Sequence, residues 1–198
     1  MKIELLMATP EKLVGECAKI CYSTKAIEDG GKDITYAMVN DYKHLASLRF
    51  AYATFTISEI SRACANQLVR SSHMDFMQES MRYVSNKKGN FEFIMPEGLS
   101  DGHKLSMENH WRSTIALYNG MVREGVKKED ARAILPLNTS TKINCTANLQ
   151  GWMSLFNLRL KPGAQAEIRK LARNIYIELA AEYPQVFTPE LFTKLQEK

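Results

Sequence analysis

The chain has 198 residues, of which 45% are hydrophobic and 24% charged, and its formal net charge is +4 at pH 7. These values are typical of a soluble globular protein, and we expect one domain over residues 1–198. No apolar run reaches the roughly 18 to 20 residues of a membrane span, and no signal peptide is indicated, so we expect a cytoplasmic protein. The mild positive charge is compatible with an anionic ligand but does not by itself predict nucleic-acid binding.

The four cysteines are spread widely along the chain. Cys17 and Cys21 are four residues apart, which suits one face of a helix, and no second close pair completes a zinc site. We therefore predict free thiols and no metal site, as is usual for a cytoplasmic protein.

The first third of the chain alternates between patterns typical of strands and of helices. Thr9 followed by Pro10 resembles the start of a helix, and Ser58 is an acceptable N-cap for a later one. The predicted elements are a strand at 1–8, helices at 10–22 and 34–48, a strand at 50–57 and a helix at 58–69.

The rest of the chain also contains both strand and helix patterns. Gly125 is predicted to end one helix and Asn148 to begin another. We predict strands at 91–95 and 139–147, a loop at 100–106, and helices at 107–124, 127–134, 149–160 and 164–182. Together these elements predict an α+β fold, with an antiparallel sheet flanked by helices.

Residues 62–83 mix charge with apolar residues more closely than any other segment. Its polar side chains include three arginines, two amides and three serines: Arg62, Arg70, Arg82, Gln67, Gln78, Ser71, Ser72 and Ser80. If the segment after residue 76 is extended, Ser80 and Arg82 point to the same side. Hydroxyl and guanidinium groups together suit a phosphate or a carboxylate. The alternative is a solvated charged helix and loop, and spacing alone does not decide between the two.

Three further polar residues are candidate site residues, and their sequence surroundings also suggest structural roles. Arg132 has apolar neighbours, so we predict a partly buried arginine that requires an anionic partner. Arg159 lies near the end of a predicted helix, where a cation also interacts favourably with the helix dipole. His44 lies near the end of another, where a lone histidine is more often a helix-end cation or a core residue than a ligand.

Several segments, in order and at nearly constant spacing, resemble the flavin-dependent thymidylate synthase family. The central one reads ISRACANQLVR, SSHMDF and QESMRYV. The others are PEKLVGECAKICYS at 10–23, KHLASLRFAYATFTI at 43–57, EDARAILPLNTSTKINCTANLQGWMSLFNLRL at 129–160 and AQAEIRKLA at 164–172. The resemblance therefore covers most of the chain.

This resemblance implies a one-carbon transfer from methylenetetrahydrofolate to C5 of dUMP, with FAD and NADPH supplying the reducing hydride. It implies no attack by a protein cysteine, which agrees with the lack of an activated cysteine signature here. It also implies a homotetramer whose active sites are shared between subunits.

The resemblance also implies roles for individual residues. The dUMP phosphate and sugar would be bound by Gln67, Ser80 and Arg82, with backbone groups of Gln78 and Glu79, and by Arg132 from a neighbouring subunit. Arg159 would contact the uracil and is the predicted catalytic residue. Arg70 would contact both ligands. The flavin and folate side would comprise His44, Asn148, Ser71, Ser72, His73 and Ser154.

The sequence departs from the family pattern on the flavin side. Where the family has Arg-His-Arg, this chain has Arg70-Ser71-Ser72, and Arg49 and Phe50 replace an acid and a histidine. Serine offers hydrogen bonds but no charge, so His73 or Arg49 would have to compensate. Three functions stay open: the synthase, a flavin-poor paralogue that hydroxymethylates dUMP or dCMP, and a non-catalytic nucleotide-binding subunit.

Overall fold

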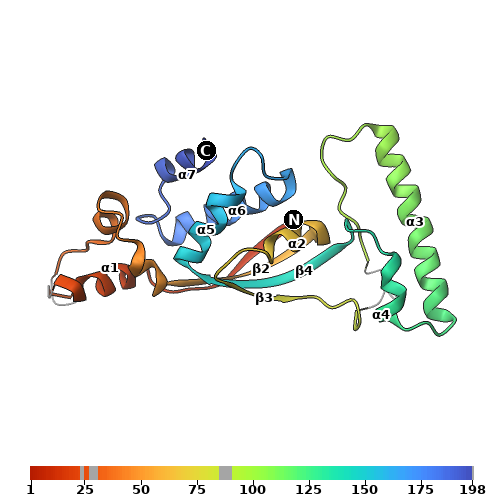
Figure 1. Ribbon diagram of the computed structural model, residues 1–198, viewed down its shortest axis with the longest axis horizontal. Coiled ribbons are helices and arrows are strands. Elements are labelled where there is room, and N and C mark those ends of the chain that lie inside the picture. The colour runs from red at the N-terminus through yellow and green to blue at the C-terminus, as the bar shows by residue number, and fades with distance from the viewer. Residues whose placement is uncertain (23–24, 27–30, 85–90, 198) are drawn as a thin grey trace.

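The computed structural model of this chain describes residues 1–22, 25–26, 31–84 and 91–197. Its centre is a four-stranded antiparallel sheet with the strand order β1-β2-β4-β3 (Figure 1). The strands are β1 (Lys2–Ala8), β2 (Tyr52–Ser61), β3 (Met74–Gln78) and β4 (Ser140–Asn148). The predicted α+β class with an antiparallel sheet is confirmed.

The helices lie over one face of this sheet and beyond its two ends. They are α1 (Lys12–Lys19), α2 (Arg62–Leu68), α3 (Asp101–Arg123), α4 (Lys128–Ala131), α5 (Leu149–Arg159), α6 (Ala166–Glu182) and α7 (Pro189–Gln196). Short 3-10 or π segments are η1 (Ile20–Tyr22), η2 (Ala37–Asp41), η3 (Leu45–Arg49) and η5 (Arg132–Ile134). Figure 1 shows α2, α5 and α6 over one face of the sheet, with α3 and α4 beyond one end and α1 at the other.

The core lies between the sheet and the helices that cover it. Alternate residues of the two central strands point inward and are fully buried, among them Phe55 and Ile57 of β2 and Ile143 of β4. This period-2 pattern is the one that predicted β4 from sequence. Trp152 of α5 packs edge-on against Phe55, with ring centroids 5.2 Å apart, and its Nε1 donates to the Ala53 carbonyl at 3.2 Å. These contacts fix α5 over the sheet.

The boundary between β2 and α2 differs from the prediction of a helix at 58–69. The strand continues to Ser61 because residues 60–61 still pair with β4, after an irregularity at which Glu59 adopts φ +57°. Ser61, not Ser58, is therefore the N-cap, and its Oγ accepts the Cys64 N–H at 3.0 Å. Ser61 Oγ in turn donates to Glu167 of α6 at 2.6 Å, which anchors the start of α2.

Three other local predictions were wrong. The predicted helix at 34–48 is interrupted between η2 and η3, where Lys43 adopts φ +57°. The predicted loop at 100–106 belongs to α3, whose N-cap is Ser100. Thr9 does not cap α1; its Oγ1 accepts the Tyr52 N–H at 2.8 Å, a contact with a distant strand.

Helix α7 was not predicted, and 91–95 forms only an isolated bridge, between Phe93 and Thr139. Asn148 does cap α5 as expected, accepting the Gly151 N–H at 2.9 Å. Gly125 has φ +92° just after α3, which confirms its role in ending that helix.

Candidate functional site

Arg159 and Gln67, ninety-two residues apart in sequence, are in direct contact. The Arg159 guanidinium donates to the Gln67 carbonyl at 2.9 Å, and its Nε is buried with no hydrogen-bond partner among the described residues. Gln67 is held from the other side, since its Nε2 donates to Gln165 Oε1 at 3.3 Å. Gln165 also caps α6. The ends of α2, α5 and α6 thus meet at a partly buried cation.

Gln165 is a residue that the sequence reasoning did not select. Its position just before a helical run predicts an N-cap and nothing more. Its contact with Gln67 arises only when α2 and α6 are packed together.

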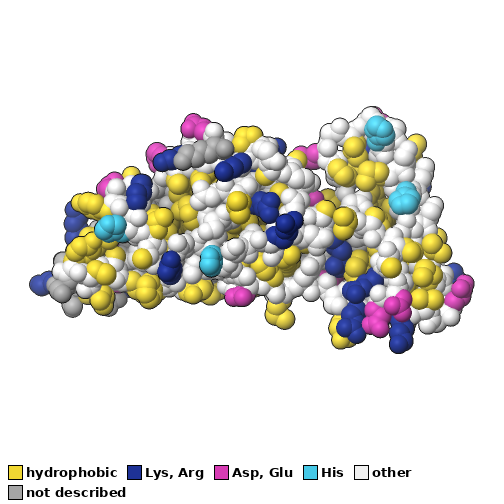
Figure 2. Space-filling model, viewed as in Figure 1, with side chains coloured by type: hydrophobic (Ala, Val, Ile, Leu, Met, Phe, Trp, Pro, Cys, Tyr) yellow, Lys and Arg dark blue, Asp and Glu magenta, His cyan; other side chains and the backbone are white. Residues whose placement is uncertain are grey.

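A second group of charged residues lies where β3 ends and α4 begins. Arg82 Nε donates to Glu129 Oε2 at 2.8 Å, and Arg132 Nε donates to the Glu129 carbonyl at 3.1 Å. Arg62 donates to the Glu79 carbonyl at 3.2 Å. Burial, with repulsion from nearby Arg132, lowers the pKa of the Arg62 guanidinium despite the attraction of Glu79. Figure 2 shows Lys and Arg gathered with acidic side chains around α4. Three arginines are therefore close to one another here.

Two details of this group correct the sequence predictions. Ser80 and Arg82 are not in an extended segment, because β3 ends at Gln78 and the Ser80 carbonyl accepts the N–H groups of Tyr83 and Val84. Ser80 Oγ accepts the Arg82 N–H at 3.3 Å, as in a turn. Arg132 is exposed, since η5 presents it outward, so it is not the partly buried arginine that its neighbours predicted.

Gln78 and Glu79 are already engaged with the central strand β4. Gln78 Nε2 donates to Thr141 Oγ1 at 3.3 Å, and the Glu79 N–H donates to the Lys142 carbonyl at 2.9 Å. These bonds fix the position of the turn that follows, and with it Ser80 and Arg82.

Residues 70–73 form a turn that is docked against the first turn of α5. His73 has φ +63°, and its carbonyl oxygen would lie 2.6 Å from a Cβ atom at Gly151. Only glycine leaves room for this approach. Ser71 is 7% exposed and its Oγ has no hydrogen-bond partner among the described residues, whereas Arg70, Ser72 and His73 are exposed.

Two predicted flavin-side residues lie on α5 itself. Asn148 is its N-cap, and Ser154 Oγ donates to the Gln150 carbonyl at 3.0 Å, so both side chains have a structural role within the helix. The structure therefore brings the His73 backbone against the first turn of α5, where Asn148 is the N-cap.

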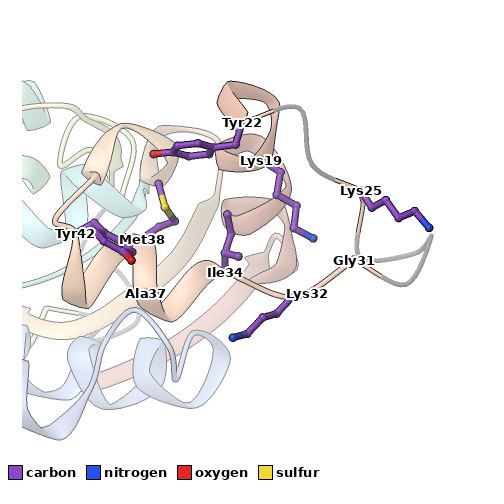
Figure 3. Close-up of a pocket in the computed structure, with 9 residues that line it drawn as sticks. All are labelled: Lys19, Tyr22, Lys25, Gly31, Lys32, Ile34, Ala37, Met38 and Tyr42. Atoms are coloured by element: carbon purple, nitrogen blue, oxygen red, sulfur yellow. The ribbon is translucent and has the colours of Figure 1, made fainter.

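His44 is exposed, so it is not a core histidine. Its Nδ1 lies 3.2 Å from the Tyr22 hydroxyl, and its ring is 6.1 Å from that of Tyr42. Both tyrosines line an open pocket of about 780 Å³ that also includes Lys19, Ile34 and Met38 (Figure 3). Figure 3 shows the Lys25 side chain extending away from the apolar part of this pocket. None of the predicted site residues lines the pocket; His44 adjoins it through Tyr22 and Tyr42.

The buried thiols are not activated. Burial raises the pKa of Cys64 and of Cys145 to about 12 in each case, so both are protonated at neutral pH. For Cys64 the negative charge of Glu167 adds to this effect and Arg159 opposes it. Neither thiol is suited to act as a nucleophile.

The fold and these two groups of residues define an α+β protein in which arginine and amide side chains from distant parts of the sequence lie close together. No helix within the described ranges is long and apolar enough to cross a membrane.

Comparison with known proteins assigns the chain to a family. Residues 4–185 match the family described as thymidylate synthase complementing protein. The chain is 33% identical to the flavin-dependent thymidylate synthase of Geobacter sulfurreducens and 31% identical to that of Clostridium tetani, in each case over 94% of this chain and 85% of the relative. It is 39% identical to the Pyrococcus furiosus protein of the same name, over 70% of this chain and 59% of the relative. The chain therefore belongs to the thymidylate synthase complementing protein family.

Proposed function

We propose that this protein is a flavin-dependent thymidylate synthase that transfers a one-carbon unit from methylenetetrahydrofolate to C5 of dUMP, with NADPH as the reductant. The observation that carries the proposal is the contact between Arg159 and Gln67, which places a partly buried guanidinium where three helices meet. A guanidinium held by a single backbone acceptor retains donors for a uracil carbonyl. The relatives bear the name of this activity.

The nucleotide phosphate would be bound by the arginine group near α4. Arg82 is paired with the Glu129 carboxylate, and a phosphate would compete with that carboxylate for the Arg82 donors. Among the residues that the structure describes, Arg132 is bound only to the Glu129 backbone carbonyl, through its Nε. Ser80, in the turn beside Arg82, adds a hydroxyl. Arg132, being exposed, is free to reach a nucleotide bound by a neighbouring subunit, as in a homotetramer with shared sites.

The flavin would lie beside the turn 70–73 and the start of α5. The residues present fit such a group in part, since Ser71 Oγ is buried with no partner in the described part of the chain and the neighbouring residue Arg70 is exposed. A bound flavin supplies the hydride that reduces the transferred carbon. The chain's own residues would hold the nucleotide and orient its base through Arg159, and neither Cys64 nor Cys145 would act as a nucleophile, because both thiols remain protonated.

We place the folate beside His44, where the pocket lined by Tyr22 and Tyr42 offers aromatic surface for its ring system. Lys19 in this pocket is paired with Glu16 at 3.2 Å, so it is less available to an anionic ligand than an unpaired lysine.

The test combines binding with turnover. Purified protein is titrated with FAD and with dUMP, and turnover with methylenetetrahydrofolate and NADPH is followed by mass spectrometry of the nucleotide. Arg159→Gln should weaken dUMP binding about 10- to 100-fold, since a hydrogen bond from a charged group contributes about 1.5–3 kcal/mol. Arg173→Gln is a matched control, because Arg173 lies 5.9 Å from the ring of Phe192 and belongs to neither group. Equal dUMP affinity in both variants would refute the role of Arg159.

One observation favours a second candidate function. The turn at 70–73 has hydroxyls at Ser71 and Ser72 and thus little charge to bind flavin. If flavin is not bound but dUMP is, a methylene adduct quenched by water would give a hydroxymethyl product from dUMP or dCMP. A protein that binds nucleotide and gives neither product would be a non-catalytic subunit.

A further inference from the structure

Arg49 bridges two distant parts of the chain beside the proposed flavin site. It is the last residue of η3, which packs against α5. Its side chain is exposed, and its Nε donates to Gln150 Oε1 at 2.5 Å across a separation of 101 residues. Among the described residues, its two terminal nitrogens have no acceptor. The guanidinium is therefore fixed by one donor and has its other donors available.

The turn at 70–73 meets the same part of α5. The His73 carbonyl packs on Gly151, which directly follows Gln150, and Met74 pairs with Ala147 just before the helix. The first turn of α5 thus contacts both segments: Gln150 accepts a hydrogen bond from Arg49, and Gly151 packs against the carbonyl of His73. Arg49 and the turn at 70–73 are therefore both attached to the first turn of α5.

Two backbone donors at the start of α5 are already used. Asn148 Oδ1 accepts the Gly151 N–H, and the Ala51 carbonyl accepts the Leu149 N–H at 2.9 Å. Within the turn, Arg70 is charged, while Ser71 and Ser72 are neutral. An anionic group bound here would need a second cation, and Arg49 is placed to supply it.

We propose that Arg49 binds the phosphate groups of the flavin together with Arg70, and that it supplies the charge that Ser71 and Ser72 lack. Gln150 acts as a positioning residue, because it fixes the guanidinium through Nε and leaves the terminal nitrogens for the ligand. This inference rests on the proposed function, since it assumes that a flavin nucleotide is bound.

The test measures flavin binding directly, by visible absorbance and by quenching of flavin fluorescence. Arg49→Gln should weaken FAD and FMN binding about 10- to 100-fold, as expected for one charge-assisted hydrogen-bonding group. Riboflavin, which has no phosphate, should bind the variant and the unmodified protein equally. Arg49→Lys should recover part of the loss, and Gln150→Ala should cost a few-fold in FAD affinity. His73→Ala tests whether that side chain contributes as well.

Controls separate this inference from the proposed function. Arg112→Gln removes an exposed arginine of α3 and should leave FAD affinity unchanged. Binding of dUMP to Arg49→Gln should also be unchanged. If the unmodified protein binds FAD and Arg49→Gln binds it equally well, or if riboflavin is affected as much as FAD, the role of Arg49 is refuted and the synthase proposal stands. If the unmodified protein binds dUMP but no flavin, both are refuted.

Discussion

Replacing Gly151 with alanine tests whether α5 and the turn at 70–73 are as closely packed as the structure indicates. A Cβ atom at this position would lie 2.6 Å from the His73 carbonyl oxygen and 3.0 Å from the Ala147 Cβ. Real Cβ atoms essentially never lie within 3.0 Å of another heavy atom, and the distance to the His73 oxygen is shorter than this. The backbone of the turn or of α5 must therefore move. Forcing atoms into a packed site costs about 1–3 kcal/mol.

The same substitution also has a favourable term, because alanine is preferred over glycine within a helix by about 1 kcal/mol. Gly120→Ala in α3 isolates that term, since a Cβ atom there has no neighbour within 4 Å. The difference between the two variants is then the clash alone, about 1–3 kcal/mol. For a chain of this size, each kcal/mol changes the Tm by about 2–4 °C.

The assay is thermal unfolding of both variants at one protein concentration, followed by a flavin titration. We expect Gly120→Ala to melt at or above the unmodified protein and Gly151→Ala to melt several degrees below Gly120→Ala. Gly151→Ala should also bind flavin more weakly, because the turn that carries Arg70 and Ser71 is displaced. A Gly151→Ala protein that melts as high as Gly120→Ala would show that the turn does not pack on α5 as described.

Three further predictions concern single contacts. Glu129→Gln should raise dUMP affinity, measured by calorimetry, about two- to fivefold, because it releases Arg82 from its ion pair. The Tm should hardly change, since an exposed ion pair contributes about 0–1 kcal/mol to stability. Unchanged dUMP affinity would contradict phosphate binding by Arg82. Cys64→Ala should retain turnover within about threefold, since a thiol with a pKa of about 12 is not a nucleophile at pH 7; a loss of activity in a folded variant would refute this. Trp152→Phe should lower the free energy of unfolding by about 1–3 kcal/mol in urea denaturation, because the Ala53 carbonyl loses its Nε1 donor. A loss below about 0.5 kcal/mol would contradict a stabilising role for this bond and would show that the Thr146 hydroxyl, which also donates to this carbonyl, or water satisfies it.

Some of this architecture was determined by the sequence alone, because its causes are local. The alternation of buried residues in β4 follows from the two-residue period of a strand, and Asn148 caps α5 through a bond to Gly151, three residues on. Gly125 ends α3 because glycine adopts a positive φ without strain. The family resemblance rests on many short segments at nearly constant spacing and also required no tertiary structure.

Other features were decided by contacts between residues far apart in the chain. Strand β2 extends to Ser61 because β4 pairs with its end, which the sequence around Ser58 does not reveal. Arg132 is exposed although its neighbours are apolar, because η5 presents it away from the core.

The arrangement of the candidate site was likewise decided by the tertiary structure. The sequence could nominate Gln67 and Arg159, but their contact depends on the packing of α2, α5 and α6. It showed that Ser71 and Ser72 carry no charge, and only the fold brought Arg49 to Gln150, on the same helical turn against which His73 packs. Local periodicity determines which elements form, whereas the packing of those elements determines which side chains meet, and binding depends on the side chains that meet.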